Sequence, residues 1–298
     1  MALTGYLAPE GFEAQLETEL GAAVAARHGR LFLCPEAPRD VAWAANTWFD
    51  VEDLPIASIG DGAKQLRARG RNWALLPIEH HRRAALIAER LPSVSFKPLV
   101  FPAPAPSAPL GSWALVAPDR LLLAARCSSP FAHGEARFVE DRAGPPNRAY
   151  LKLWEALTVA GVRPAPDALC LDLGASPGGW TWVLASLGAR VIAIDKAPLD
   201  PKVAALPGVD ARLGSAFALE PASLPPVDWL VCDVVCYPKR LLGLIRKWLD
   251  AGRARRIVAT LKFQGDTDFE TIAAFRALPG GQLRHLHHNR HELTFVRL

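Results

Sequence analysis

Two lysines and two carboxylates at the ends of predicted elements are the residues of this sequence best suited to chemistry. Asp233 and Lys262 each follow an apolar run that predicts a strand. Lys152 lies near the start of a predicted helix, and Glu292 opens the last predicted strand. Lysine and carboxylate side chains accept, donate and orient protons in many enzymes. One such residue alone more often forms a surface salt bridge, so the interpretation depends on these four residues, the charged quartet, occurring together.

A glycine-rich turn between a predicted strand and a predicted helix forms a second candidate site. Glycines let the backbone turn sharply and approach a ligand, and the free N–H groups at a helix start favour an anionic group. Asp195 ends the next predicted strand, where an acid can bind both hydroxyls of a ribose. The turn favours an adenosine-type cofactor, although a purely structural turn is the alternative, and it does not separate S-adenosylmethionine from NAD. The residues of the turn expected to contact the cofactor are Gly174, Ser176, Pro177, Gly178, Gly179 and Trp180.

Predicted strands and helices alternate regularly from residue 147 to residue 298. The strands are expected over 169–173, 191–194, 229–232, 257–261 and 293–296. The helices are expected over 150–160, 178–187, 238–249 and 269–278. Apolar strands separated by helices are typical of a doubly wound, mostly parallel sheet with a Rossmann-like α/β fold. Ligands bind such sheets at the carboxyl ends of the strands, where Asp233 and Lys262 are expected.

The first half of the chain has a different organisation. Strand-like pieces over 3–7, 31–34, 55–59 and 73–76 alternate with helix-like pieces over 10–20 and 78–91, which predicts a small α+β module over residues 1–98. Residues 99–112 contain four prolines and no charged residue, so they are expected to form an extended connector. The runs 113–116 and 121–125 predict a strand pair, and residues 99–146 are assigned together as the second segment.

Composition limits the class of protein without identifying it. The chain has 298 residues, is 50% hydrophobic and carries a net charge of +4, which is compatible with a polyanionic partner without establishing one. Its five cysteines form no CxxC pair, and Cys170 and Cys232 lie in apolar runs typical of a core. The sequence shows no secretion signal and no apolar stretch of membrane-spanning length, so we expect a cytoplasmic protein.

The charged quartet and the glycine turn together resemble the FtsJ-type RNA ribose 2′-O-methyltransferases. The quartet matches that family's Lys-Asp-Lys-Glu tetrad in order and context. The segments NRAYLKL, LDLGASPGGWT, CDVV and LKF resemble its corresponding blocks between residues 147 and 298. The resemblance implies a class I methyltransferase domain that uses S-adenosylmethionine and modifies RNA.

Residues outside this domain resemble one branch of the family. Residues 113–138 look like the end of a THUMP RNA-binding module, and residues 7–20 look like the start of the branch that methylates cytidine in bacterial large-subunit ribosomal RNA. The implied partner is large-subunit rRNA before full assembly, because a folded ribosome hides most riboses. The centre of the N-terminal half is abbreviated relative to that branch.

Two positions depart from the branch's cofactor contacts. Ala149 stands where the branch has a serine, so any contact there must use the backbone. Ser215 stands where the family often has an acid facing the adenine, so it can bind the amino group without charge. Asp233 is expected to contact both the cofactor and the reacting groups.

The resemblance implies a role for each member of the quartet. A ribose hydroxyl is a weak acid, so its proton must leave as the methyl group arrives. A lysine ordinarily titrates near ~10.4, and a neighbouring ammonium with partial burial favours its neutral form. We therefore expect Lys262 to be the base, with Lys152 assisting its deprotonation and stabilising the developing alkoxide. Asp233 is expected to orient Lys262 and the methyl donor, and Glu292 to hold Lys152. The sulfonium is its own leaving group, so no metal is expected.

Weaker signals leave alternatives open. The basic residues around Trp73 and residues 80–83 could track RNA or be a solvated helix face. The histidines at 285, 287, 288 and 291 have no carboxylate at ligand spacing, so metal binding is not favoured. The same chemistry could act on transfer RNA or another RNA. A non-catalytic RNA-binding protein with a degenerate methyltransferase fold is the alternative of another class.

Overall fold

The computed structural model describes residues 2–298 and divides the chain into two compact units. Unit 1 comprises the residues up to Leu99 and residues 105–137, and unit 2 comprises residues 100–104 and 138–298. The connector predicted over 99–112 is therefore shared, and unit 2 begins earlier than the predicted boundary at 147. Aromatic packing explains the assignment, because Phe101 stacks on Trp154 with ring centroids 4.8 Å apart and Phe138 packs against the same indole at 5.7 Å.

Unit 2 is built on a seven-stranded sheet with the strand order β12-β11-β10-β13-β14-β16-β15. All neighbouring pairs are parallel except those of β16, which runs antiparallel to both β14 and β15. The predicted Rossmann-like, mostly parallel sheet is confirmed. Its strands are β10 Leu169–Leu173, β11 Arg190–Asp195, β12 Val209–Leu213, β13 Val227–Cys232, β14 Ala254–Lys262, β15 Gly281–Arg284 and β16 Glu292–Arg297.

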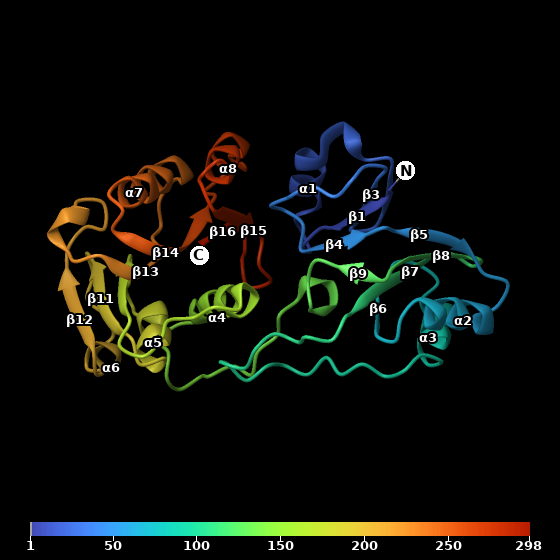
Figure 1. The fold of residues 1–298 in the computed structure, drawn as a ribbon, viewed down its shortest axis with the longest axis horizontal. Helices are drawn as coiled ribbons and strands as arrows, with labels where there is room; N and C mark the ends of the chain where they lie inside the picture. Colours follow the sequence, from blue (N-terminus) through green and yellow to red (C-terminus); the bar gives the residue numbers. More distant parts are fainter. Residues whose placement is uncertain (1) are drawn as a thin grey trace. The chain divides into compact units, whose positions relative to one another are not determined.

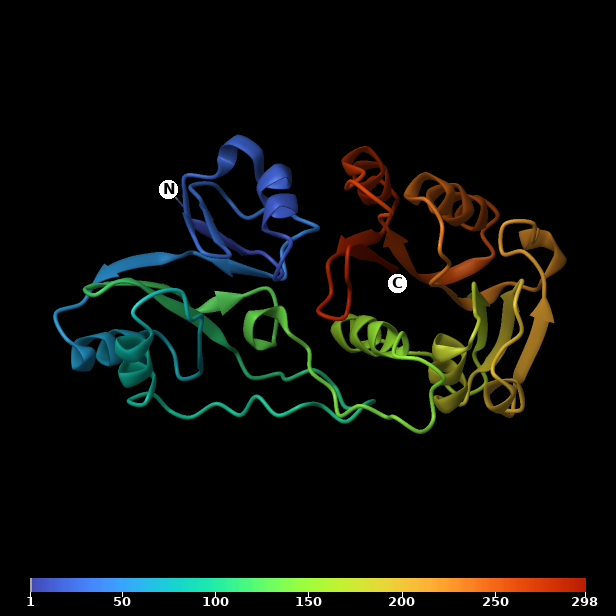
Figure 2. The same cartoon turned by 180° about the vertical axis from the view of Figure 1, so that it is seen from behind.

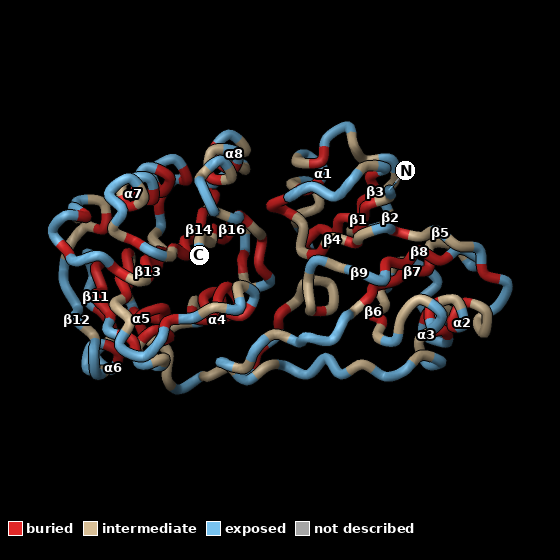
Figure 3. Tube along the Cα trace, in the orientation of Figure 1, coloured by how far each residue is buried: buried red, intermediate tan, exposed pale blue. Residues whose placement is uncertain are grey.

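Helices cover both faces of this sheet. Figures 1 and 2 show α4, α5 and α6 on one face and α7 and α8 on the other. Most residues of the central strands are buried (Figure 3), because helices cover both faces of the sheet, which explains their continuous apolar sequence. Strands β12 and β15 were not predicted, because edge strands are partly exposed and their sequences are correspondingly polar. The helices are α4 Tyr150–Ala160, α5 Gly179–Ser186, α6 Pro201–Ala204, α7 Pro238–Asp250 and α8 Phe269–Arg276.

Unit 1 contains two sheets, with the strand orders β2-β3-β1-β4-β9 and β5-β8-β7-β6. Alternate side chains of β7 and β8 point to different cores: Trp113 and Leu121 pack with α2 and α3, whereas Ala114 and Leu122 pack with strands of the other sheet. The elements of unit 1 are β1 Thr4–Leu7, α1 Glu13–Leu20, β2 Ala26–His28, β3 Leu31–Cys34, β4 Asn46–Phe49, β5 Glu52–Pro55, α2 Ile59–Arg69, β6 Trp73–Leu75, α3 His81–Ala88, β7 Gly111–Ala117, β8 Arg120–Ala124 and β9 Arg126–Cys127.

One prediction for unit 1 was wrong, and one alternative that the sequence left open is excluded. The strand expected over 55–59 is absent: β5 ends at Pro55 and α2 begins at Ile59, because the Ser58 side chain accepts a hydrogen bond from the Asp61 N–H and caps the helix. Trp73 does not offer a stacking surface to RNA. Its side chain is buried, and its indole N–H donates to backbone carbonyls of α2 and the turn that follows.

No helix among the described residues is both long enough and apolar enough to cross a membrane.

We expect Gly134→Ala to destabilise unit 1 more than Gly11→Ala. Both glycines have a positive φ, +80° and +81°, which costs a side-chain-bearing residue about 1–2 kcal/mol. A Cβ at Gly134 would also overlap the carbonyl oxygen of Ala45, whereas Gly11 has no heavy atom within 4 Å of that position. The overlap should add about 1–3 kcal/mol to the loss measured by urea unfolding. Equal losses for the two variants would show that residues 45 and 134 move apart without cost.

Candidate active site

The topology of unit 2 brings the charged quartet to one edge of the sheet. Asp233 directly follows β13, and Lys262 is the last residue of β14, so both lie at the carboxyl ends of parallel strands. Glu292 begins β16, whose antiparallel direction brings its first residue to the same edge, directly opposite Lys262 in the ladder. Lys152 lies in the first turn of α4, which packs on β16.

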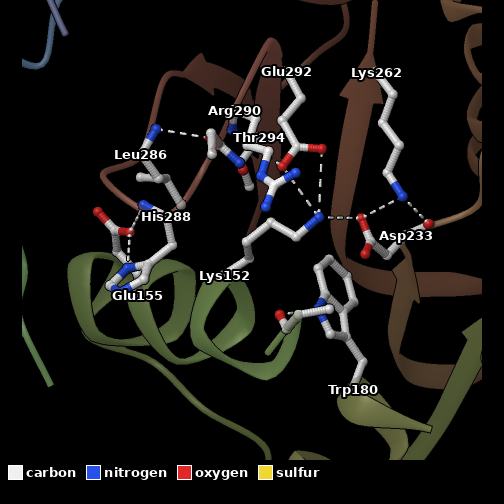
Figure 4. A network of polar contacts seen from close by, with 12 residues as sticks. Lys152, Glu155, Trp180, Asp233, Lys262, Leu286, His288, Arg290, Glu292 and Thr294 are labelled. Atoms are coloured by element: carbon white, nitrogen blue, oxygen red, sulfur yellow. Dashed lines mark hydrogen bonds and ion pairs between the residues drawn. The ribbon is translucent and has the colours of Figure 1, made fainter. Parts of the chain in front are cut away.

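Asp233 lies between the two lysine ammonium groups (Figure 4). Its Oδ1 is 2.8 Å from Nζ of Lys152 and 3.1 Å from Nζ of Lys262. Lys262 also donates to the backbone carbonyl oxygen of Asp233 at 2.5 Å. Glu292 approaches Lys152 from the other side, with Oε1 at 3.2 Å. The four side chains that the sequence singled out are therefore in direct contact.

Burial makes these contacts strong. The four side chains are only 10–18% exposed, so water screens their charges far less than on an open surface. The formal charges of two ammonium groups and two carboxylates cancel. Lys152 contacts two carboxylates, whereas Lys262 contacts one carboxylate that it shares with Lys152. The arrangement therefore contains one lysine that is firmly paired and one that is less so.

The glycine turn joins β10 to α5, as predicted. Gly174 has φ +78°, and a Cβ there would come within 2.7 Å of the Val234 side chain, which follows Asp233. The turn thus packs directly against the segment that carries the shared carboxylate. The N-cap of α5 is Gly178, and no side chain among residues 2–298 caps this helix end. Its first N–H groups therefore have no partner within the helix.

Asp195 and Ser176 hold the turn in place. The Ser176 N–H donates to Oδ2 of Asp195 at 3.0 Å, and the Ala197 N–H donates to Oδ1 at 3.0 Å. The Ser176 hydroxyl donates to the carbonyl oxygen of Pro198, and the Pro177 carbonyl accepts from the Asp200 N–H. Each carboxylate oxygen of Asp195 retains acceptor capacity beyond these bonds.

Trp180 and Ala149 connect α5 to α4. The Trp180 indole N–H donates to the Ala149 carbonyl oxygen at 2.9 Å, and the Ala149 N–H donates to the side chain of Asn147. Both backbone groups of Ala149 are thus engaged inside the protein. Ser215 follows β12 and is partly exposed, and its carbonyl oxygen accepts from the N–H groups of the next turn.

Asp172 is a buried carboxylate that the sequence reasoning did not single out. It lies on β10, is 0% exposed, and accepts a hydrogen bond from the Thr181 hydroxyl of α5 at 2.7 Å. Its other oxygen has no hydrogen-bond partner among the described residues. Burial raises the pKa of Asp172 from its ordinary value of 3.8 to about 7, with the nearby Asp233 and Asp195 adding to the rise. The signal in the sequence is an acid within an otherwise apolar strand.

A carboxylate that sequence spacing could not reveal lies beside the histidines. Glu155 of α4 accepts a hydrogen bond from Nδ1 of His288 at 2.8 Å. It is distant in sequence, so ligand spacing could not reveal it. No group of three or more histidine, cysteine or acidic side chains among residues 2–298 is arranged to hold a metal ion.

Comparison with known proteins agrees with this geometry. Residues 145–258 match the sequence pattern of the FtsJ-like methyltransferase family. This part of unit 2 is therefore similar to the FtsJ-like methyltransferases. The resemblance deduced from the sequence blocks is confirmed.

Relatives named ribosomal RNA large subunit methyltransferase M are similar to about half of this chain. The protein from Halorhodospira halophila is 41% identical over 157 residues, which cover 50% of this chain and 46% of the relative. The protein from Aromatoleum aromaticum is 36% identical over 164 residues, covering 50% and 44%. The protein from Alkalilimnicola ehrlichii is 36% identical over 182 residues, covering 56% and 49%. The matched segments thus span about half the length of these relatives.

The raised pKa of Asp172 predicts a pH-dependent difference in stability between the native chain and Asp172→Asn. Because the folded-state pKa lies above the ordinary value, the folded chain holds this proton more tightly than the unfolded chain. Its contribution to stability is complete below about pH 4 and is lost as the pH rises through about 7. Asparagine has no such titration.

The asparagine variant should therefore gain stability relative to the native chain between pH 4 and pH 7, by a total on the order of 3–4 kcal/mol. Thermal unfolding of both proteins across this range measures the difference. A difference that does not change with pH would mean that Asp172 titrates equally in the folded and unfolded chains.

Proposed function

We propose that this chain transfers a methyl group from S-adenosylmethionine to a ribose 2′-hydroxyl of RNA. The observation that carries the proposal is the buried contact of Lys152, Asp233, Lys262 and Glu292 at the edge of an FtsJ-like domain, beside the glycine turn. In this cluster a lysine in its neutral amine form can accept the proton of a hydroxyl, and the neighbouring ammonium group can stabilise the negative oxygen that results.

The residues around the glycine turn fit S-adenosylmethionine. The uncapped N-terminus of α5 suits the cofactor's carboxylate, and the remaining acceptor capacity of Asp195 suits the ribose diol. Ser215 lies two residues after β12, the strand that pairs with β11, and its hydroxyl suits the adenine amino group. When bound, S-adenosylmethionine supplies a methyl group on a positively charged sulfur, and the neutral thioether that remains is the leaving group, so no metal is required. The other assigned contacts are the backbone groups of the turn and the carboxylate of Asp233. Ala149, also assigned to the cofactor, can offer only van der Waals contact, because its N–H and its carbonyl oxygen already have partners within the protein.

Within the quartet, Lys262 is the base. Among the described residues Lys262 contacts one carboxylate, which it shares with Lys152, whereas Lys152 lies between Asp233 and Glu292. Lys262, as its neutral amine, receives the proton of the 2′-hydroxyl and becomes an ammonium group, and the ammonium group of Lys152 stabilises the oxygen as its negative charge develops. Asp233 fixes the position of both ammonium groups, and burial excludes water that would otherwise compete.

The RNA is most simply a large-subunit ribosomal RNA before full assembly, since the similar relatives carry that name. Unit 1 is the RNA-binding part in this proposal, as its resemblance to a THUMP module implies. Its exposed basic residues, such as Arg71 and Arg82, can contact phosphates. A reaction on ribosomal RNA would take place in the cytoplasm.

We expect Lys262→Ala to lower methyl transfer by about 10²- to 10⁴-fold, because it removes the proton acceptor. Transfer of labelled methyl from S-adenosylmethionine to protein-free ribosomal RNA measures the rate, and nuclease digestion locates the label on a 2′-oxygen. Cofactor affinity should change little. The matched control is Lys239→Ala, which removes a lysine paired with Glu270 on the surface. Undiminished transfer by Lys262→Ala would exclude Lys262 as the base.

Tyr237 is expected to contact the RNA base next to the methylated ribose. It lies four residues after Asp233 and is 68% exposed, and Val235 beside it is 73% exposed. Unpaired bases stack on such aromatic side chains. Tyr237→Ala should raise KM for RNA roughly 5- to 100-fold, as the loss of about 1–3 kcal/mol of stacking implies.

The variant Tyr237→Phe keeps the ring and should behave like the native chain. Val159→Ala changes another exposed apolar residue, on the last turn of α4, and is the control for surface effects. An unchanged KM for RNA in Tyr237→Ala would remove this residue from the RNA contact.

A further inference from the structure

The segment between β15 and β16 is held by contacts from two elements that carry members of the charged quartet. We call residues 285–291, which lead directly into Glu292, the histidine turn. Four of its seven residues are histidines. These histidines do not belong to any group of three or more side chains among residues 2–298 that could hold a metal ion. The connections of the turn are therefore structural links between parts of the site.

Glu155 of α4 makes the first link. Its Oε1 accepts from the His287 N–H at 2.7 Å, and its Oε2 accepts from the His288 N–H at 2.9 Å and from Nδ1 of His288 at 2.8 Å. Figure 4 shows the Glu155 side chain reaching the turn from α4. The carboxylate side chain is only 1% exposed, so all three hydrogen bonds form away from water, where they are strong.

The second link runs from the turn to the end of β14. The Phe263 N–H donates to the His291 carbonyl oxygen at 3.1 Å, and Phe263 directly follows Lys262. The Thr267 hydroxyl lies 2.8 Å from Nε2 of His291. The turn therefore contacts the backbone directly after the lysine-bearing strand and a side chain of the loop that follows.

The turn is also rigid in itself. The Asn289 side-chain oxygen accepts from the Leu286 N–H at 2.8 Å and from the Thr294 hydroxyl at 3.0 Å. The Glu292 N–H donates to the Arg290 carbonyl oxygen at 2.8 Å. Displacement of one end of the turn must therefore move Glu292 as well.

We propose that Glu155 is a positioning residue for the methyl-transfer site, acting through the histidine turn. This role rests on the proposed function. Glu155 lies three residues after Lys152, so both side chains project from the same face of α4. Lys152 contacts Glu292, and Glu155 contacts the histidine turn, which leads into Glu292. Two residues of α4 therefore fix the start of β16. The Lys152–Glu292 distance is thereby set by Glu155.

The test is the variant Glu155→Gln in the full chain. Glutamine has the same shape, but its amide N–H₂ would face a backbone N–H that needs an acceptor, so the turn should shift. We expect kcat to fall about 10- to 100-fold, as a displacement of about 1 Å in an active site implies, with KM for S-adenosylmethionine within about twofold of the native value. Glu155→Asp retains the charge and should restore part of kcat.

Two further variants separate positioning from general stability. His288→Asn removes the side-chain bond of His288 and leaves both backbone bonds to Glu155, so its loss of kcat should be smaller than that of Glu155→Gln. Glu270→Gln removes a carboxylate that is 81% exposed and paired with Lys239, and should leave kcat unchanged. Hydrogen exchange of the His287 and His288 amides should accelerate in Glu155→Gln, which reports the turn without reference to activity.

The outcomes distinguish this role from the proposed function. An active native chain with an equally active Glu155→Gln variant, measured well below the unfolding temperature of both, overturns the positioning role alone. A loss of kcat that Glu155→Asp does not relieve, accompanied by an equal loss of cofactor affinity, also overturns it, because it indicates general disruption. A native chain that transfers no methyl group overturns the proposed function and the positioning role together.

Discussion

The ion pairs of the Asp233 carboxylate with Lys152 and Lys262 are the interactions around which the site in unit 2 is arranged. One oxygen of this carboxylate lies 2.8 Å from the ammonium group of Lys152 and 3.1 Å from that of Lys262. Two buried cations this close would repel each other strongly without the negative charge between them. Removing such charges from water has a large cost, which is offset only where the geometry is fixed and the remaining donors and acceptors are satisfied. The elements around Asp233 must therefore be rigid, and the glycine turn, the antiparallel strand and the histidine turn each contribute to that rigidity.

The direction of β16 has a specific consequence for this cluster. In a purely parallel sheet the first residue of a strand lies at the edge opposite to the ligand-binding edge. Because β16 is antiparallel to β14, its first residue, Glu292, pairs directly with the last residue of β14, Lys262. A second carboxylate thereby reaches Lys152 from the far side of Asp233. The departure from a fully parallel sheet is thus what completes the cluster.

The two units differ in how their stability relates to the site. Unit 1 has its own cores, on both faces of the β7–β8 pair, and depends on apolar packing and on glycines with positive φ. Unit 2 combines apolar strands with buried charges, and residues 100–104 pack on it through the stacking of Phe101 on Trp154. Recognition of RNA by unit 1 and chemistry in unit 2, as proposed, would then rest on different physical interactions.

The sequence by itself determined the β/α alternation of unit 2, the glycine turn and the identity of the charged quartet. Strongly apolar strands bounded by polar or glycine-rich turns carry their own local signal, as at Leu169–Leu173 and Tyr150–Ala160, where the expected bounds match the structure. Local signals failed where surrounding residues determine the structure. The edge strand β12 is too exposed to have an apolar sequence. Residues 56–58, where a strand was expected, lead into the N-cap of α2. Only the tertiary structure could show that Asp172 is buried with one oxygen unpartnered, or that Glu155 binds a turn 132 residues further along the chain. Burial and long-range hydrogen bonding depend on which segments of the chain pack together in space. The spacing of residues within one segment does not contain that information.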